Sequence, residues 1–295
     1  MRLASNENSF ANYCGVYRQD LTDFSDKEVL TPEMPDSERE SSFSEHNTDS
    51  SIAHEDDTGI LIDNEIHPRI EENPLHEIAG TAFGLGILLG GSFGLLPYIT
   101  FKNFNLYLIA LALFHFLEFY TTARFNPGKV TSQSFLLNNG RGYILSHILA
   151  TLETLVECIF FPKWKSTTYS ASHKIIVLSG IVLVIFGQFI RTAAMVTAGR
   201  SFSHYVKTKR NSDHELITTG IYAWSRHPSY LGFFWWALGT QMCLLNIVSF
   251  FVFLIILWNF FHQRIKFEEK FLIQFFGEEY LRYRRRVPVG IPFAS

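Results

Sequence analysis

Long apolar runs separated by short polar segments constrain this chain more than any other feature. Six runs follow residue 77, at Ile78–Ile99, Phe104–Ala123, Tyr143–Phe161, Lys174–Thr197, Tyr230–Leu245 and Ile247–Phe261. A helix needs about 20 mostly apolar residues to cross a bilayer core about 30 Å thick. Within lipid the backbone must satisfy its own hydrogen bonds, which a helix does. We therefore predict an all-α integral membrane fold with about six transmembrane helices, the last two forming a C-terminal helical hairpin.

Charge divides the chain into two unlike parts. Residues 1–77 carry 19 acidic and 5 basic residues, whereas residues 78–295 carry 9 acidic and 20 basic ones. A highly charged segment with few large apolar residues cannot bury enough surface to offset its ordering entropy. We predict a disordered acidic tail over 1–76, four transmembrane helices over 77–199 and a separate region over 200–295 with the helical hairpin and a C-terminal helix.

The basic residues also predict the orientation of the spans. Arg124, Lys129 and Arg141 flank the loop after the second run, and five more basic residues fill the loop after the fourth. Because cytosolic loops are enriched in Lys and Arg, these loops and both termini are expected in the cytosol. Lys163 and Lys165, in a loop expected on the other side, weaken this bias without reversing it.

Composition argues against several other classes of protein. The three cysteines are scattered, so there is no disulfide framework and no cysteine cluster for a metal, and we expect no metal site. The basic residues lie between apolar runs instead of forming a stripe, so membrane flanks explain them better than a nucleic-acid partner.

Four ionisable residues lie inside the apolar runs. His115 and Glu118 share one face of the second run, and Glu153 and Glu157 share one face of the third. Ionisable groups are costly in hydrocarbon and usually face a partner or a wet cavity. We favour structural pairing or cavity lining over a proton relay.

A polar and aromatic segment, residues 200–230, directly precedes the expected hairpin. Thr219 and Gly220 favour a turn. Pro228 keeps His227 out of the helical region and can open the next helix, with first-turn amides available to a ligand. This pattern is typical of a binding site at the membrane surface, and an interfacial aromatic belt is the plainer interpretation.

A second cluster begins where the last apolar run ends. Arg264 and Glu268 are four residues apart and therefore lie on one helical face. Alone they could be a solvated ion pair, which is how we interpret their neighbours Lys266, Glu269 and Lys270.

A hairpin changes this interpretation, because it returns the end of its second helix to the start of its first. His227, Tyr230, Arg264 and Glu268 should then meet in one cytosol-facing pocket. An arginine beside a carboxylate can hold an anionic and a cationic ligand together.

Three stretches make residues 77–293 resemble the isoprenylcysteine carboxyl methyltransferases, membrane enzymes that methylate the C-terminal prenylcysteine of processed C-a-a-X proteins. They are Gly220–Tyr230, which includes Arg226-His227-Pro228-Ser229-Tyr230; Gly239–Gln241; and the close of the chain, Phe275–Tyr283 and Val287–Phe293. The Arg-His-Pro-x-Tyr element alone also resembles phospholipid N-methyltransferases and, more loosely, sterol reductases.

The resemblance implies S-adenosyl-L-methionine as methyl donor. It assigns cofactor contacts to Lys207, His214, Glu215, Leu216, Ile217, Tyr222, His227, Pro228, Ser229, Tyr230 and Glu268. It assigns the substrate carboxylate to Arg264, so that Arg264 and Glu268 are the catalytic candidates. Relatives can have a neutral amide at the position of Lys207, which leaves open whether that contact uses the side chain or the backbone.

The resemblance also implies a multi-pass protein of the endoplasmic reticulum membrane, with its active site facing the cytosol. Its partners would be the prenylated cysteine of C-a-a-X proteins, such as Ras-like GTPases and lipopeptide pheromones, together with membrane lipid. A lateral opening between spans would admit the prenyl chain.

The residues fit this chemistry. A C-terminal carboxyl has a pKa of about 3.3–3.7, so it is already ionised and needs no general base. Of the alternatives, a phospholipid N-methyltransferase has no use for an arginine anchor because its nucleophile is an amine. An NADPH-dependent sterol reductase is disfavoured by the short chain and by the Arg264–Glu268 pair, and a channel or scaffold does not explain the polar segment.

Overall fold

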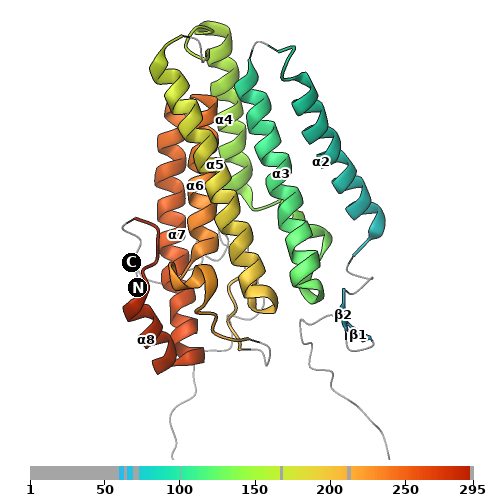
Figure 1. The fold of residues 1–295 in the computed structure, drawn as a ribbon, viewed down its shortest axis with the longest axis vertical. Coiled ribbons are helices and arrows are strands. Elements are labelled where there is room, and N and C mark those ends of the chain that lie inside the picture. Colours follow the sequence, from blue (N-terminus) through green and yellow to red (C-terminus); the bar gives the residue numbers. More distant parts are fainter. Residues whose placement is uncertain are drawn as a thin grey trace, which may run out of the picture. The chain divides into compact units, whose positions relative to one another are not determined.

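The computed structural model describes residues 60–62, 65–68, 73–99, 101–166, 169–210 and 214–292, and most of these are helical (Figure 1). The long helices are α2 Leu75–Leu95, α3 Lys102–Phe125, α4 Arg141–Phe160, α5 Ala171–Ala198, α6 Pro228–Leu244 and α7 Ile247–Phe276. The short ones are η1 Pro127–Lys129, η2 Ser132–Phe135, η3 Gly199–Ser201, η4 Gly220–Ala223 and α8 Glu278–Arg286. Each predicted apolar run overlaps one long helix.

Five of these helices are long and apolar enough to cross a membrane. They are α2, α3, α4, α5 and α7; the remaining long helix, α6, has 17 residues. The prediction of a helical chain with several membrane-spanning segments is therefore confirmed. α7 is longer than its apolar run, since it continues for 15 residues beyond Phe261 and carries Arg264 and Glu268.

Two short strands lie in the segment for which we predicted disorder. β1 Ile60–Ile62 pairs antiparallel with β2 Glu65–His67, with Leu61 opposite Ile66. Three isoleucines within these six residues explain the difference, because β-branched side chains favour extended backbone. The remainder of the predicted tail before residue 60 lies outside the described residues.

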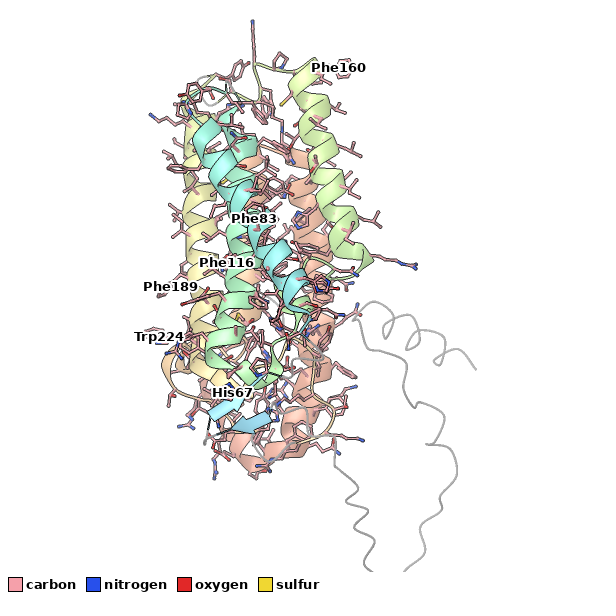
Figure 2. All side chains as sticks on the ribbon, turned by 90° about the vertical axis from the view of Figure 1, so that its right-hand side faces the viewer. His67, Phe83, Phe116, Phe160, Phe189 and Trp224 are labelled. Carbon is pink, nitrogen blue, oxygen red and sulfur yellow. The ribbon has the colours of Figure 1, made fainter. Side chains whose placement is uncertain are left out.

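The outer faces of α2, α4 and α5 are apolar. Phe83, Phe160 and Phe189 project outward with 71%, 69% and 69% of their surface exposed (Figure 2). Soluble monomers rarely expose continuous apolar surface on this scale. Lipid tails are the covering that these helices require.

Helices α5 and α6 touch through glycines. Gly187 on α5 faces Gly232 on α6 so closely that a Cβ built on Gly187 would lie 2.5 Å from the Gly232 carbonyl oxygen. Gly180 and Gly239 make a second contact of the same kind, about two helical turns away on each helix. A Cβ on Gly239 would lie 2.8 Å from the Gly180 carbonyl oxygen. Small residues permit such backbone contact between membrane helices. This contact fixes the start of α6 against the end of α5.

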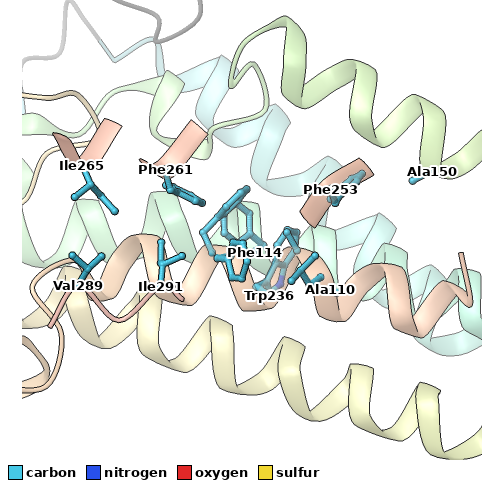
Figure 3. Packing of buried hydrophobic residues seen from close by; sticks show 13 residues of the cluster. Ala110, Phe114, Ala150, Trp236, Phe253, Phe261, Ile265, Val289 and Ile291 are labelled. Atoms are coloured by element: carbon cyan, nitrogen blue, oxygen red, sulfur yellow. The ribbon is translucent and has the colours of Figure 1, made fainter. Parts of the chain in front are cut away.

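A buried core joins α3, α6, α7 and the C-terminal segment. Phe114 of α3 stacks on Trp236 of α6 with ring centroids 4.4 Å apart. Farther along the same core, Val289 and Ile291 lie across from Ile265 of α7 (Figure 3). The residues after α8 are therefore packed into the helical core.

A buried lysine closes the connection between α6 and α7. Lys165 Nζ donates to the carbonyl oxygens of Leu244 and Leu245 at 2.9 and 3.2 Å and to Asn246 Oδ1 at 2.7 Å. A cation at a helix C-terminus satisfies carbonyls that have no partner within the helix. Lys165 also pairs with Glu157. Its burial explains why a lysine occupies a loop expected to carry few basic residues.

Glu153 has a second structural role at the same connection. Its carboxylate accepts the amides of Val248 and Ser249 at 2.8 and 2.7 Å, which caps the start of α7. The prediction of structural pairing is thus confirmed for Glu153 and Glu157.

Candidate functional site

A cleft opens at the end of the helices where α8 lies. It has about 690 Å³ of empty space, part of it open to solvent. Its walls come from the end of α5, η3, the segment 214–230, α7 and α8. The candidate cofactor residues that line it are His214, Glu215, Leu216, Ile217, Tyr222, His227, Pro228, Ser229, Tyr230 and Glu268.

Two helix-breaking positions shape the wall of the cleft. Gly220 is the first residue of η4 and has φ +59°. Glycine tolerates a positive φ better than any other residue. His227 lies outside the helix, and Pro228 is the first residue of α6. Both positions behave as predicted. The amides of Tyr230 and Leu231, however, bond to the His227 carbonyl oxygen at 3.1 and 3.0 Å, so the helix itself uses these first-turn donors.

Tyr230 links the two clusters singled out in the sequence. Its hydroxyl donates to Glu268 Oε2 at 2.8 Å and accepts from Arg264 Nε at 2.8 Å. The Arg264 guanidinium lies over the Tyr230 ring, 5.3 Å from its centroid, and Nη2 donates to the His204 carbonyl oxygen at 2.5 Å. Arg264 and Glu268 therefore flank one phenol hydroxyl, Glu268 lining the cleft and Arg264 behind the wall that Tyr230 forms.

His227 lies between two carboxylates. Its ring stacks parallel on Tyr230, with centroids 5.5 Å apart. Its Nδ1 is 3.6 Å from Glu268 Oε2 and its Nε2 is 3.3 Å from Glu269 Oε1. This arrangement holds the imidazole edge-on to the acidic side of the cleft.

Glu269 does not lie on a solvated face as we had predicted. It is buried, and its Oε1 accepts from Arg226 Nη2 at 2.8 Å while its Oε2 is 3.3 Å from Arg284 Nε. Arg226 also donates to the Val287 carbonyl oxygen, and its amide bonds to the Pro288 carbonyl oxygen. Helical spacing placed Glu269 beside Glu268 but carried no information about the C-terminal segment that folds over it. Lys266 and Lys270 are exposed, as predicted.

Two tyrosines complete the cleft on the side of α8. Tyr283 donates its hydroxyl hydrogen to the Tyr222 carbonyl oxygen at 2.7 Å. Burial raises the pKa of Tyr283 to about 12, and burial also raises the pKa of Tyr222 well above its usual value. Both phenols therefore stay protonated at neutral pH and act as uncharged donors.

The structure adds an arginine beside the cleft that was not among the predicted site residues. Arg191 of α5 is buried and forms a forked ion pair with Glu118 of α3. Its Nη1 donates to Ser229 Oγ at 2.9 Å, next to the cleft. The available signal was a single arginine inside an otherwise apolar run, which usually marks a paired or functional group. Glu118 is paired as predicted, with Arg191 and His204.

Lys207 differs from the other candidate cofactor residues because it does not line the cleft. The His214 ring in the next described stretch of chain packs edge-on against Phe276 at 5.3 Å. The structure thus brings the loop 214–217 into the cleft without the Lys207 side chain.

Comparison with known proteins gives a consistent result. The model of the isoprenylcysteine carboxyl methyltransferase (ICMT) family matches residues 180–274. Protein-S-isoprenylcysteine O-methyltransferase of Saccharomyces cerevisiae is 59% identical over 227 residues, covering 77% of this chain and 95% of the relative. The Homo sapiens protein of the same name is 40% identical over 221 residues, covering 75% and 76%. A solved eukaryotic intramembrane Ras methyltransferase ICMT aligns with a TM-score of 0.70 at 36% identity, covering 74% of this chain and 77% of that one.

Proposed function

Because this chain belongs to the isoprenylcysteine carboxyl methyltransferase family, we propose that it transfers a methyl group from S-adenosyl-L-methionine to the C-terminal carboxylate of a prenylated cysteine. The observation that carries the proposal is the Tyr230 hydroxyl, which joins Arg264 and Glu268 at 2.8 Å each beside the cleft. Glu268 can bind the sulfonium of the methyl donor and Arg264 the carboxylate of the substrate, so their closeness suits two ligands that must react with each other.

The cleft supports the choice of cofactor. Glu268 presents a carboxylate, and Tyr222 and Tyr230 present aromatic rings, both of which attract a cation. The loop 214–217 contributes polar and apolar contacts along the same wall. When bound, S-adenosyl-L-methionine supplies an electrophilic methyl group on a sulfonium. His214–Ile217, Tyr222, His227–Tyr230 and Glu268 would hold it.

Arg264 would orient the substrate carboxylate. That group is already an anion at neutral pH, so no side chain has to remove a proton. Tyr230 and the His204 carbonyl oxygen fix the guanidinium, whose planar fork can present paired donors to a carboxylate. Catalysis then depends on placing one carboxylate oxygen in line with the methyl group and on excluding water.

The chain is a multi-pass membrane protein, and we extend this to a six-span arrangement in the endoplasmic reticulum membrane. α6 would be the short sixth span and, with α7, the hairpin that carries the site. Trp224 is 80% exposed (Figure 2) and lies in the chain between Tyr222 and Arg226, which line the cleft. It supports a cleft at the membrane–water boundary, where tryptophan is enriched. The basic loops favour the cytosolic side for that boundary. The division into a tail at 1–76, a four-helix part at 77–199 and a catalytic part at 200–295 goes with this arrangement.

The substrates would be C-a-a-X proteins such as Ras-like GTPases and lipopeptide pheromones. Their prenyl chains partition into lipid, which explains a transferase embedded in a membrane. The apolar faces around the cleft would receive the chain laterally from the bilayer.

A methyl-transfer assay tests the proposal. Membranes containing the full chain are incubated with methyl-labelled S-adenosyl-L-methionine and an N-acetylated farnesylcysteine, and base-labile methyl ester is measured. The matched control is the same farnesylcysteine with its carboxylate converted to an amide, which should accept no methyl group. Label in phospholipid headgroups instead of the ester would indicate a phospholipid N-methyltransferase and refute the proposal.

A further inference from the structure

Glu118 is more deeply buried than any other acidic side chain of the site. It lies on α3 with 1% of its surface exposed, and its carboxylate meets three donors. Arg191 binds both oxygens, Nη2 reaching Oε2 at 2.8 Å, and His204 Nε2 lies 3.0 Å from the same Oε2. An ionised group in this position is expensive unless its partners are fixed.

Arg191 is held as firmly as Glu118. Its guanidinium lies against two phenyl rings, 5.5 Å from the centroid of Phe114 and 5.6 Å from that of Phe233, and the two rings also contact each other. Its Nη1 bonds to Ser229 at the start of α6. Glu118 is therefore tied through one arginine to α5 and α6, which the glycine contact already holds together.

His204 connects this buried pair to the substrate side of the site. Its side chain contacts Glu118, while its backbone carbonyl oxygen accepts from Arg264 Nη2 at 2.5 Å. It belongs to the loop after η3, which Asn126 holds through the Phe202 carbonyl oxygen, and the Glu118 contact is the anchor at His204 itself. A chain of contacts thus runs from Glu118 through His204 to Arg264.

We infer that Glu118 is a positioning residue: it anchors His204, and through the His204 carbonyl it sets the orientation of the Arg264 guanidinium toward the substrate carboxylate. The inference rests on the proposed function, since it assigns Glu118 to the prenylcysteine half of the reaction. Of the proposed cofactor contacts, those of Glu268, Tyr222 and the loop 214–217 do not involve Glu118 or His204, whereas Ser229 bonds to Arg191. Loss of the anchor should therefore affect one substrate much more than the other.

The test compares substrate kinetics with cofactor binding in two variants. Glu118→Gln keeps the shape of the side chain but removes the charge and one acceptor. His204→Ala leaves the Glu118–Arg191 pair intact and removes the contact between His204 and Glu118. If the Glu118→Gln protein does not accumulate in cells, the His204→Ala protein alone decides the test. Each should raise the KM for the farnesylcysteine analogue or lower kcat/KM by about tenfold or more, as misplacement of a reacting group by about 1 Å does. The dissociation constant of S-adenosylhomocysteine should change by less than about twofold.

Two further variants separate positioning from general loss of structure. His204→Gln keeps a donor at about the reach of Nε2 and should restore most of the activity that His204→Ala loses. Glu157→Gln disrupts the ion pair with the buried Lys165 at the far end of α6 and should lower stability without changing the KM for the analogue.

The outcomes distinguish this inference from the proposed function. Wild-type protein that methylates no prenylcysteine refutes the function itself. Active wild type with unchanged kinetics in His204→Ala, or with substrate and cofactor binding weakened equally in both variants, overturns the role of Glu118. Failure of His204→Gln to restore activity overturns it as well.

Discussion

Replacing Gly187 with alanine should force α5 and α6 apart where their backbones touch. A Cβ at this position would lie 2.5 Å from both the Gly232 carbonyl oxygen and the Trp236 amide nitrogen. Carbon atoms rest at about 3.5–4.0 Å from their neighbours, so the helices must separate by about 1 Å. Because both neighbours are backbone atoms within a helix, no side-chain rotation can relieve the contact.

The cost has a structural and a functional part. Overpacking of this kind destabilises a protein by about 1–3 kcal/mol. Arg191 lies one turn further along α5, and a shift of about 1 Å would stretch its 2.9 Å bond to Ser229 beyond hydrogen-bond range. Misplacement on that scale can lower a rate up to about a hundredfold. Both a lower stability and a lower kcat are therefore expected.

Thermal unfolding in detergent and the labelled-methyl assay measure the two effects. Gly84→Ala on α2 is the matched control, because a Cβ there meets nothing within 4 Å. It should leave the rate unchanged and the stability unchanged or slightly higher, since alanine favours a helix over glycine. A Gly187→Ala protein with wild-type stability and rate would refute the reasoning that this backbone contact positions the site.

Other changes test further parts of the structure. Arg264→Lys should lower kcat/KM for the prenylcysteine analogue by about tenfold or more and leave S-adenosylhomocysteine binding unchanged. The reason is that an ammonium cannot reproduce the two directed donors that reach Tyr230 and His204. A wild-type rate would contradict this role. Lys207→Gln should change the KM for S-adenosyl-L-methionine by less than about twofold, since the Lys207 side chain does not line the cleft, and a large increase would show that it contacts the cofactor. Lys165→Met should lower the free energy of unfolding by about 3–5 kcal/mol, as loss of one partner of a buried ion pair does, while the folded protein keeps its kcat/KM. An unfolding temperature equal to that of the wild type would show that the contacts of Lys165 are dispensable.

Much of the site could be predicted because its residues are close in sequence or regularly spaced. Pro228 starts α6 and Gly220 starts η4, as their backbone preferences require. Arg264 and Glu268, four apart on α7, both reach the Tyr230 hydroxyl. These positions depend on local conformation, which the sequence encodes directly.

The rest depended on contacts between distant segments. Glu269 carries the same helical signal as an exposed acid, yet the C-terminal segment and Arg226 enclose it. Lys165 had been a weak exception to the charge rule and proved to be a cap on α6. Periodicity predicts which face of a helix a residue occupies, but it does not predict which other segment covers that face.

Local sequence patterns were enough to predict that this chain forms membrane helices, where these begin and end to within a few residues except at the end of α7, and which two short stretches carry the polar groups of the site. Tertiary structure alone decided that Arg191, from the apolar middle of the chain, stands beside Ser229 and that Glu118 reaches Arg264 through His204. The two kinds of feature differ in how far apart along the sequence the interacting residues are. Helix formation and turn geometry are set by a few neighbouring residues, whereas a contact such as Arg191–Ser229 forms only when packing, here through glycines of α5 and α6, brings remote polar groups within about 3 Å.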